Sequence, residues 1–443
     1  MTSAPRLVMV VNNAVHGDSR VQRCAAAAAR AGWAVTVLGR SGDRERHVWE
    51  TADGVAMELL PVPVVMAGRS FTETVRDRFL VHPRLRERDR MAGHRGRTLR
   101  HGAWRLLDPW LADYELAIAG RIEALRPDVI HVHDRHPVPA VARSVAALRA
   151  AGHDVSWVLD AHEDVAATAD RGARGLRGWL RRRMVHGEQD EWIREADAVV
   201  TVSDELADTL WRRHRLSTRP TVVLNAAEPL RSDAAIAGLR EQLRLPADTP
   251  LLVYSGGCAP ARGLASVVAS IPHLDALRGR ADTHVALLTA PTDPYVPGLL
   301  AQADDMGLGH RVHRVDYVPA EHITAMLRSA DVGLVPLLRT PNHDIALVTK
   351  YLEYLHAGLP VACSTVRTMA AFTRTHGVGE VFTAGDPPDL AEAVARILDD
   401  PGTYRARIAS SAAVAATAWP EQAERLLAMY AQIAPHRVSG VPG

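Results

Sequence analysis

The stretch LVMVVNNAVHGDSRVQRCAAAAARAGWAVTVL, residues 7–38, decides the fold of this chain. Its apolar, β-branched start, residues 7–11, predicts a buried strand, and a polar loop then leads into an alanine-rich helix from about residue 20 to residue 31. Gly32 ends that helix, and the apolar run 34–38 predicts a second strand. A strand, a helix and a strand in this order are typical of a parallel β-α-β unit, because parallel strands need a crossover between them.

The same alternation runs through the rest of the 443 residues. In the first half, apolar runs predict strands at residues 129–132, 156–159, 198–202 and 222–224. After a polar connection with one short helix, further runs predict strands at residues 251–254, 285–288, 312–315, 332–335 and 360–363. Strands that alternate with helices indicate parallel α/β sheets. We therefore predict two doubly wound parallel-sheet domains that face each other across a cleft, with ligands beyond the carboxyl ends of the strands.

The domain boundaries follow from this pattern. The predicted N-terminal domain is 1–228 and the predicted C-terminal domain is 229–417. A final segment, 418–443, carries an amphipathic helix whose apolar residues recur at helical spacing up to Ile433.

Composition excludes several classes of protein. The formal net charge of +1 gives no global attraction to nucleic acid or to a membrane. The three cysteines lie far apart without metal-ligand spacing, which favours a reducing compartment over a disulfide framework. We predict a cytoplasmic protein, because no stretch is apolar enough to span a membrane and no signal-like start precedes the first strand.

One insertion departs from the regular alternation. Residues 76–105 hold ten arginines against three acids, a local charge of +7, with large apolar residues between them. A second arginine cluster follows at residues 171–183. Two interpretations stay open: a basic amphipathic segment that contacts an anionic membrane at the inner face, or a solvated flap at the rim of the cleft.

Lysine occurs once, at Lys350, whereas nearly all other positive charge is arginine. Lysine is a compact point charge on a flexible stem, whereas arginine is a broad planar fork. A crowded phosphate pocket would favour the compact charge. Lys350 and Glu353 share one face of a predicted helix, which suits a ligand with a phosphate end and a diol end. The alternative is an ordinary ion pair on that helix, worth about 0.2–0.5 kcal/mol.

A glycine-rich turn follows the first strand of the second half. Gly256, Gly257 and Gly263 lie between a predicted strand and a helix that begins near residue 264. Glycines allow the backbone to approach a ligand closely, and a helix N-terminus offers free N–H groups to an anion. Arg262 in the same turn would add a bidentate phosphate partner.

Histidines and acids gather after two strands of the first half. His131, His133 and Asp134 end one predicted strand, and residues 160–164, which include His162, end the next. A metal site is one interpretation of such a cluster. We expect no metal, because the residues come from different strands and the sequence holds no HExxH or paired-cysteine motif.

Taken in order, these segments resemble the GT-B-fold glycosyltransferases of the family 4 type over nearly the whole chain. The resemblance rests on residues 17–21, 126–134, 159–163, 196–203, 223–225, 256–263, 330–336 and 349–361, with a final helix at 419–422. It implies two Rossmann-like domains, with the final helix crossing back to the first one. It also implies an enzyme that transfers a sugar from a nucleotide-diphosphate donor with retention of configuration.

The resemblance also implies roles for individual residues. Arg262 and Lys350 would bind the diphosphate and stabilise the leaving group, and Glu353 would bind the donor ribose. His162 would lie near the reacting carbon. The remaining donor contacts would come from the loop at Gly17, from Gly256 and Gly257, from Tyr317 and Val318 beside the base, and from the loop of Asn342, His343, Asp344 and Ile345 beside the sugar.

Two departures from the family pattern concern charge. Gly257 stands where many members carry arginine, and Ile345 stands where many carry glutamate, with Asp344 adjacent. The Thr349-Lys350 pair resembles a subgroup in which lysine supplies the missing positive charge. No Asp-x-Asp motif is present to hold a divalent ion, so we expect arginine, lysine and helix N-termini to neutralise the diphosphate without a metal cofactor.

Other functions are weaker fits. A dinucleotide oxidoreductase would need G-x-G-x-x-G in the first loop, and a P-loop nucleotidase would need its own glycine-lysine motif. A pyridoxal-phosphate phosphorylase would have to use Lys350. A sugar-nucleotide epimerase or a catalytically silent binding protein stays open as the alternative. The donor base and sugar stay open, as does the acceptor, whether a natural product, a lipid carrier or a saccharide.

Overall fold

The computed structural model describes residues 4–16, 18–65, 110–165, 175–226, 237–318 and 320–435. Contacts divide the chain into two units, which are described separately. Unit 1 comprises Met1–Val223 and Ala423–Gly443, and unit 2 comprises Leu224–Gln422; the sequence placed the divisions after residues 228 and 417. The basic insertion 76–105 and Gly17 lie outside the described residues.

Unit 1 is built on an eight-stranded sheet. Its strands are β1 (Arg6–Val10), β2 (Ala34–Arg40), β3 (His47–Glu50), β4 (Ala56–Leu60), β5 (Val129–His133), β6 (Ser156–Ala161), β7 (Ala198–Thr201) and β8 (Thr221–Val222). Their order is β3-β4-β2-β1-β5-β6-β7-β8. All pairs are parallel except β3 with β4. Sequence reasoning missed β3 and β4, because their apolar residues are interrupted by charged ones such as Glu58.

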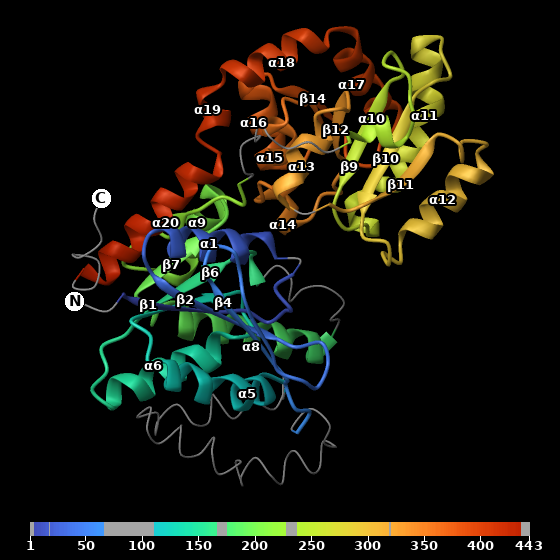
Figure 1. Cartoon of the computed structure of the whole chain (residues 1–443). Coiled ribbons are helices and arrows are strands. Elements are labelled where there is room, and N and C mark those ends of the chain that lie inside the picture. The colour runs from blue at the N-terminus through green and yellow to red at the C-terminus, as the bar shows by residue number, and fades with distance from the viewer. Residues whose placement is uncertain are drawn as a thin grey trace. The chain divides into compact units, whose positions relative to one another are not determined.

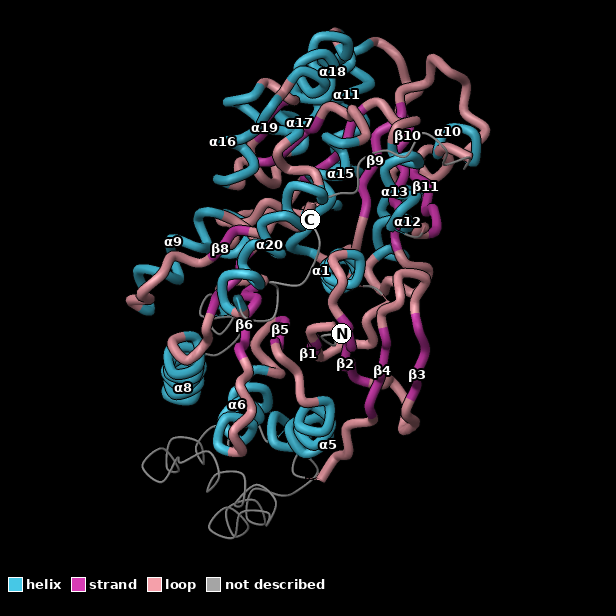
Figure 2. Tube along the Cα trace, turned by 60° about the vertical axis from the view of Figure 1, so that its left-hand side comes forward, coloured by secondary structure: helices cyan, strands magenta, loops and turns pink. Residues whose placement is uncertain are grey.

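Helices cover both faces of this sheet, as Figures 1 and 2 show. On one face lie α5 (Trp110–Leu125), α6 (Val138–Ala150) and α8 (Gly175–Ile193), and on the other lie α1 (Ser19–Arg30), α9 (Asp204–His214) and α20 (Trp419–Ile433). Tyr430 of α20 is fully buried against Trp33 and His131. This contact attaches the C-terminal helix to unit 1.

Unit 2 has a six-stranded, fully parallel sheet. Its strands are β9 (Leu251–Ser255), β10 (His284–Thr289), β11 (Val312–Asp316), β12 (Val332–Val335), β13 (Val361–Ser364) and β14 (Gly379–Phe382), in the order β11-β10-β9-β12-β13-β14. The sequence prediction missed β14, whose four residues include Gly379 and Glu380. The doubly wound parallel architecture predicted for both halves is confirmed.

Helices of unit 2 range from single turns to long amphipathic segments. They are α10 (Leu239–Gln242), α11 (Leu264–Arg278), α12 (Val296–Asp305), α13 (Ala320–Leu327), α14 (Pro341–Asp344), α15 (Thr349–His356), α16 (Arg367–His376), α17 (Pro387–Asp399), α18 (Pro401–Ser410) and α19 (Ala412–Ala415), with a 3₁₀ turn, η1 (Pro260–Arg262). The residues 342–344, predicted as a loop, lie in α14, because the Thr340 hydroxyl caps its first turn.

The two sides of the unit 2 sheet bury alternate residues of each strand. Leu251 and Val253 pack in the cluster that contains α13 and α15, whereas Leu252 and Tyr254 pack in the cluster that contains α11 and α17. Successive side chains of a strand point to opposite faces. A strand covered on both faces must therefore be continuously apolar, which explains the uninterrupted runs in the sequence.

The order of each sheet reverses at one point, between β1 and β5 in unit 1 and between β9 and β12 in unit 2. Loops that leave these strand pairs diverge, and ligands of doubly wound sheets bind in the crevice that opens there. We call these two positions the unit 1 and unit 2 switch points. They locate the candidate site.

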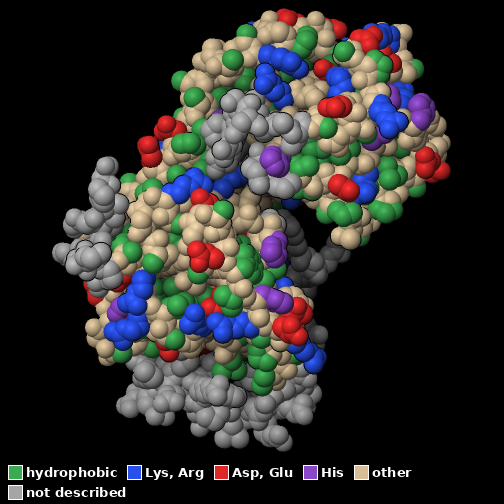
Figure 3. Space-filling model, viewed as in Figure 1, with side chains coloured by type: hydrophobic (Ala, Val, Ile, Leu, Met, Phe, Trp, Pro, Cys, Tyr) green, Lys and Arg blue, Asp and Glu red, His purple; other side chains and the backbone are tan. Residues whose placement is uncertain are grey.

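Surface charge and helix apolarity concern the nucleic-acid and membrane partners considered from the sequence. Basic and acidic side chains are interspersed over the face of each unit shown in Figure 3, in keeping with the nearly balanced charge. Within the described ranges, none of the helices has the length and apolarity that crossing a bilayer requires.

Candidate functional site

At the unit 2 switch point, the glycine-rich turn is held against the loop that follows β12. Gly256 and Gly263 have φ angles of +115° and +72°, which side-chain-bearing residues rarely adopt. A Cβ added to Gly263 would lie 1.8 Å from the carbonyl oxygen of Pro336. The Leu338 N–H also donates to the Ala261 carbonyl oxygen at 3.0 Å. Glycine is therefore required at both ends of this turn.

Lys350 lies directly against this turn. A Cβ added to Gly256 would come within 3.0 Å of the Lys350 Nζ, and the ammonium lies 3.6 Å from the centroid of the Tyr254 ring. The residue is only 9% exposed, yet it forms no ion pair with any described residue. The ordinary helix ion pair with Glu353 is therefore absent from the part of the chain that the structure describes.

A second cation adds to this positive site. Arg262 is half-buried in η1, and its guanidinium likewise forms no ion pair with a described carboxylate. Burial, and next the Arg262 charge, hold the pKa of Lys350 well below its usual value, although Glu353 opposes the shift. Two cations that repel each other beside a glycine turn and the start of α11 form a site for an anion.

The turn itself is fixed by hydrogen bonds with the side chains of two buried tyrosines and one half-buried aspartate. The Tyr254 hydroxyl donates to the Gly257 carbonyl at 2.7 Å, and the Tyr354 hydroxyl accepts from the Ser255 N–H at 2.8 Å. The Asp293 carboxylate accepts from the Cys258 N–H at 2.7 Å. Sequence reasoning missed these supporting residues. For Tyr254, its place just before the glycines could have indicated the role.

The predicted sugar-side residues are already engaged within unit 2. The Asp344 carboxylate accepts from Arg339 Nη2 at 2.8 Å and from the Arg367 N–H at 3.2 Å. The His343 Nδ1 lies 2.6 Å from the Leu338 carbonyl oxygen. Asn342 belongs to the same short helix, which follows β12 at the switch point. Asp344 therefore cannot simply replace the carboxylate missing at Ile345.

The predicted ribose and base residues lie on other elements of unit 2. Glu353 is 4% exposed and stands one turn after Lys350 on α15. Tyr317 and Val318 follow β11 directly, and the Tyr317 side chain is 47% exposed. These positions share the carboxyl-end edge of the sheet with the glycine turn.

At the unit 1 switch point, the loop after β1 is locked by its own side chains. The Asn13 amide donates to Asp18 at 2.8 Å, and the Asp18 carboxylate caps α1 by accepting from the Val21 N–H. Val15 has a φ angle of +65°, a strained conformation for a β-branched residue. Such strain is common at functional sites.

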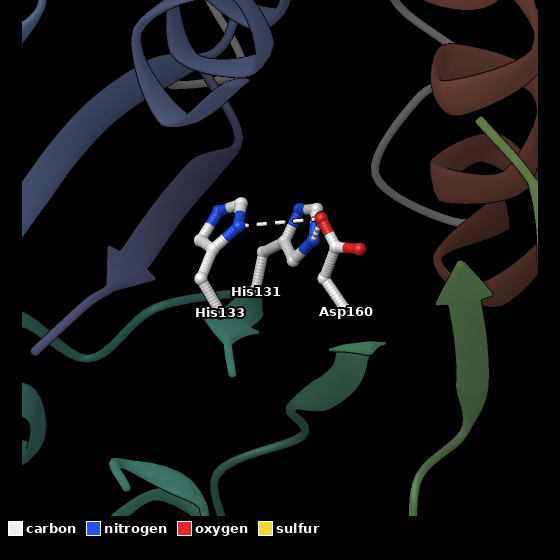
Figure 4. A group of neighbouring side chains, drawn as sticks. All are labelled: His131, His133 and Asp160. Carbon is white, nitrogen blue, oxygen red and sulfur yellow. Dashed lines mark ion pairs between the residues drawn. The ribbon is translucent and has the colours of Figure 1, made fainter. Parts of the chain in front are cut away.

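A buried cluster centred on Asp160 lies at the carboxyl ends of β5 and β6. Arg20 Nε and Nη2 each donate to one oxygen of the Asp160 carboxylate at 2.8 Å. The ring nitrogens of His131 and His133 lie 3.3 and 3.2 Å from the same carboxylate, as Figure 4 shows. His162 Nε2 approaches it at 3.4 Å. We call these five residues the Asp160 cluster.

The cluster also tests the metal interpretation. His131, His133 and Asp160 bring potential ligand atoms within 4.8 Å of one another. However, Arg20 occupies both oxygens of Asp160, so a dication bound here would lie beside a guanidinium. The donor set therefore fits a metal poorly. Sequence reasoning missed Arg20, because its partner lies 140 residues away in the chain.

His162 has a carboxylate at each ring nitrogen. Its Nδ1 lies 3.2 Å from Asp134 and its Nε2 lies 3.4 Å from Asp160. Burial alone would lower the pKa of His162, but Asp160 and then Asp134 overcome that effect and raise it to about 10. Burial and the neighbouring His133 lower the pKa of His131 to about 4. At neutral pH, His162 is therefore charged, as Arg20 is, and His131 is neutral.

In comparisons with known proteins, each half of the chain matches a glycosyltransferase family model. Residues 18–229 match the model described as Glycosyltransferase Family 4, and residues 249–400 match the model described as Glycosyl transferases group 1. The chain is 32% identical over 225 residues to a D-inositol 3-phosphate glycosyltransferase of Thermobispora bispora. That alignment covers 48% of this chain and 49% of the relative, so the chain spans about half the length of this relative.

Solved structures share the fold over nearly the whole length. A sucrose-phosphate synthase of Thermosynechococcus elongatus superposes with a TM-score of 0.69 at 19% identity, covering 98% of this chain and 100% of that one. An Anabaena protein solved with UDP and glucose superposes with a TM-score of 0.64 at 14% identity, covering 97% of this chain and 100% of that one. At such identities the likeness shows the fold alone.

Proposed function

We propose that this chain, which belongs to the GT-B glycosyltransferases of the family 4 type, transfers a sugar from a nucleotide-diphosphate sugar to an acceptor. One observation carries the proposal. The Lys350 ammonium is nine-tenths buried, lies against the Gly256 turn and forms no ion pair with a described residue. A diphosphate at this turn would supply the missing negative charge.

The energetics favour an anionic ligand at this position. A buried charge is costly unless it is paired, which is why the protein alone lowers the pKa of Lys350. A bound diphosphate would favour the charged form of Lys350 and would also pair with Arg262 and the N–H groups at the start of α11. The same cations would stabilise the charge that develops on the leaving nucleotide.

The other contacts follow from position on the unit 2 sheet. Glu353, on the same helix as Lys350, would accept hydrogen bonds from the ribose hydroxyls. Tyr317 and Val318, after β11, would flank the base, and the α14 residues from Asn342 to Asp344 would contact the sugar. UDP is the first nucleoside diphosphate to test, because the Anabaena structure of this fold was solved with UDP and glucose.

Retention of configuration and independence from metal are part of the proposal. Both nitrogens of His162 already face carboxylates, so His162 is poorly placed to act as a base. We propose same-face attack by the acceptor, with the unit 2 cations in the place of a metal ion. The His162 charge would then act electrostatically near the reacting carbon.

A thermal-shift series with UDP, GDP, ADP, CDP and dTDP tests nucleotide binding. The correct nucleotide at 100 times its Kd should stabilise the protein by about 2.7 kcal/mol. Lys350→Met should abolish the shift. Failure of every nucleoside diphosphate to stabilise the wild-type protein would overturn the proposal.

Transfer assays with the matching nucleotide sugars then test the chemistry. We expect glycoside formation that EDTA does not reduce; loss of activity in EDTA that added Mg²⁺ restores would refute metal independence. Because Asp344 is engaged by Arg339 and Ile345 has no carboxylate, a nucleotide-sugar epimerase is the second candidate. Conversion of the free nucleotide sugar to its epimer without acceptor would favour it.

A further inference from the structure

The C-terminal helix α20 reaches the Asp160 cluster through one side chain. Tyr430 is fully buried, and its hydroxyl lies 2.5 Å from His131 Nδ1. The other ring nitrogen, His131 Nε2, lies 3.3 Å from Asp160 Oδ2 but without the alignment of a hydrogen bond. Among the described residues, the tyrosine hydroxyl is therefore the hydrogen-bond partner that fixes the His131 ring.

Both contacts of His131 fit a single arrangement of protons. Burial raises the pKa of Tyr430 well above its usual value, so the phenol keeps its proton at neutral pH. His131 is neutral there and has one N–H and one lone pair. The ionised Asp160 carboxylate only accepts hydrogen bonds, so His131 Nε2 carries the proton and Nδ1 accepts from Tyr430. The opposite tautomer would set a lone pair against the carboxylate.

This series of contacts ends at the most exposed residue of the cluster. The His131 ring stacks on His133 with 4.3 Å between the ring centroids, and both rings lie beside Asp160 in Figure 4. His133 Nδ1 lies 3.2 Å from Asp160 and 3.3 Å from His162 Nε2. The first four residues, from Tyr430 to Asp160, are fully buried, whereas 19% of the His162 side chain is exposed. A displaced His131 ring would therefore disturb His162 through its neighbours.

We propose that Tyr430 is a positioning residue for His162. Its hydroxyl donates to His131 Nδ1, holds the proton of that ring on Nε2 beside Asp160, and thereby keeps the Asp160 carboxylate oriented toward His162. The C-terminal helix thus contributes to the site without touching a substrate. The effect on turnover rests on the proposed glycosyl transfer, whereas the arrangement of protons rests on the geometry of unit 1 alone.

Histidine NMR tests the arrangement without turnover. In the full-length protein, labelled with a heavy nitrogen isotope in its histidine rings, His131 should carry a proton on Nε2 and none on Nδ1 at neutral pH. The variants His131→Leu and His162→Gln assign the two rings. Tyr430→Phe should move the His131 Nδ1 resonance and the resonances of His162. A proton on His131 Nδ1 in the wild-type protein would overturn the proposal, even if Tyr430→Phe does not fold.

Tyr114→Phe is the matched control. Tyr114 is equally buried in unit 1, but its hydroxyl donates to the Val11 carbonyl at 2.9 Å, outside the Asp160 cluster. This variant loses a comparable hydrogen bond and should leave the resonances of both histidine rings unchanged. If Tyr430→Phe moves the His162 resonances no further than Tyr114→Phe does, the positioning role is refuted.

Kinetics test whether Tyr430 acts through His131. Tyr430→Phe should lower kcat about 2- to 10-fold, the usual effect of one hydrogen bond, and leave the donor KM unchanged. In a His131→Leu background the same substitution should alter kcat by less than about twofold, because its route to His162 is already broken. An equal loss of kcat in both backgrounds would contradict action through His131.

The outcomes separate this inference from the proposed function. The expected proton arrangement, found in a protein that binds no nucleoside diphosphate, would support the contacts from Tyr430 to His162 and refute the glycosyl transfer. Unmoved His162 resonances in Tyr430→Phe, together with glycosyl transfer by the wild-type protein, would overturn this inference alone.

Discussion

The two switch points carry their charge in opposite ways. In unit 1, the buried Asp160 carboxylate is surrounded by Arg20 and three imidazoles. In unit 2, the buried Lys350 and the neighbouring Arg262 form no ion pair with any described residue. A charge compensated within the protein contributes to the folded structure, whereas an uncompensated cation favours an anionic ligand. Mutations at the two points should therefore affect different properties.

The largest effect is expected from Asp160→Asn. It leaves Arg20 buried without its carboxylate, and breaking a buried pair in this way costs about 3–5 kcal/mol. Urea unfolding followed by tryptophan fluorescence should show this loss in the free energy of unfolding. A loss below about 1 kcal/mol would remove the distinction between the two switch points.

Lys350→Met should have the opposite profile. Turnover should fall about 100- to 1,000-fold, as for other removed electrostatic stabilisers, because the leaving diphosphate loses a cation. The free energy of unfolding should stay unchanged or rise, because a buried, unpaired charge is removed. Steady-state kinetics and urea unfolding measure the two quantities.

Two controls sharpen the Lys350 result. Lys350→Arg should not restore turnover, because the planar guanidinium does not fit the space at Gly256. Arg328→Met, at an exposed position of unit 2, removes the same charge and should leave turnover near the wild-type value. Normal turnover of Lys350→Met would contradict the assigned phosphate role.

The charge on His162 should make the stability of unit 1 depend on pH. The pKa of His162 is raised to about 10 in the folded protein, against about 6.5 when unfolded. The stabilisation from its charge is therefore fully present below about pH 6.5 and is lost as the pH rises through about 10. Replacement by glutamine should cost about 1.5–3 kcal/mol at pH 6, the usual range for hydrogen bonds to charged groups.

The unfolding free energies of wild type and His162→Gln, measured from pH 6 to about pH 10, test this expectation. Their difference should shrink toward the alkaline end. A difference that stays constant over this range would show that the pKa of His162 is not raised in the folded protein.

The smallest effect is expected at Tyr254, whose ring faces the Lys350 ammonium. Tyr254→Leu should weaken nucleoside diphosphate binding by about 0.5–2 kcal/mol, because the cation–π contact is lost. Tyr254→Phe keeps the ring and should weaken binding less, through loss of the bond to the Gly257 carbonyl alone. Equal affinities of wild type and Tyr254→Leu, by calorimetry, would contradict a positioning role.

Much of the fold was predictable, because it depends on local signals. The apolar runs predicted the approximate positions of eleven strands. The end of the first helix before Gly32, and the helix that carries Lys350, were also predictable from neighbouring residues. Strands β3, β4 and β14 were missed. They are short or interrupted by charged residues, and pairing with neighbours stabilises them rather than their own pattern.

The candidate site was likewise only partly predictable from the sequence. The glycines at 256 and 263, Arg262 and Lys350 were identified from residue type and position after a strand. The supports of these residues were not, because Tyr254, Tyr354 and Asp293 reach the turn through tertiary contacts. Arg20 was missed as a partner of Asp160 for the same reason.

The sequence by itself determined where strands, helices and glycine turns occur, since apolar periodicity and backbone freedom act over a few residues. It also singled out the one lysine. Only the tertiary structure decided which buried charges are compensated, because compensation depends on groups that are distant in the chain and meet on folding. That is why Asp160, rich in partners, and Lys350, without an ion pair among the described residues, could be told apart only in three dimensions.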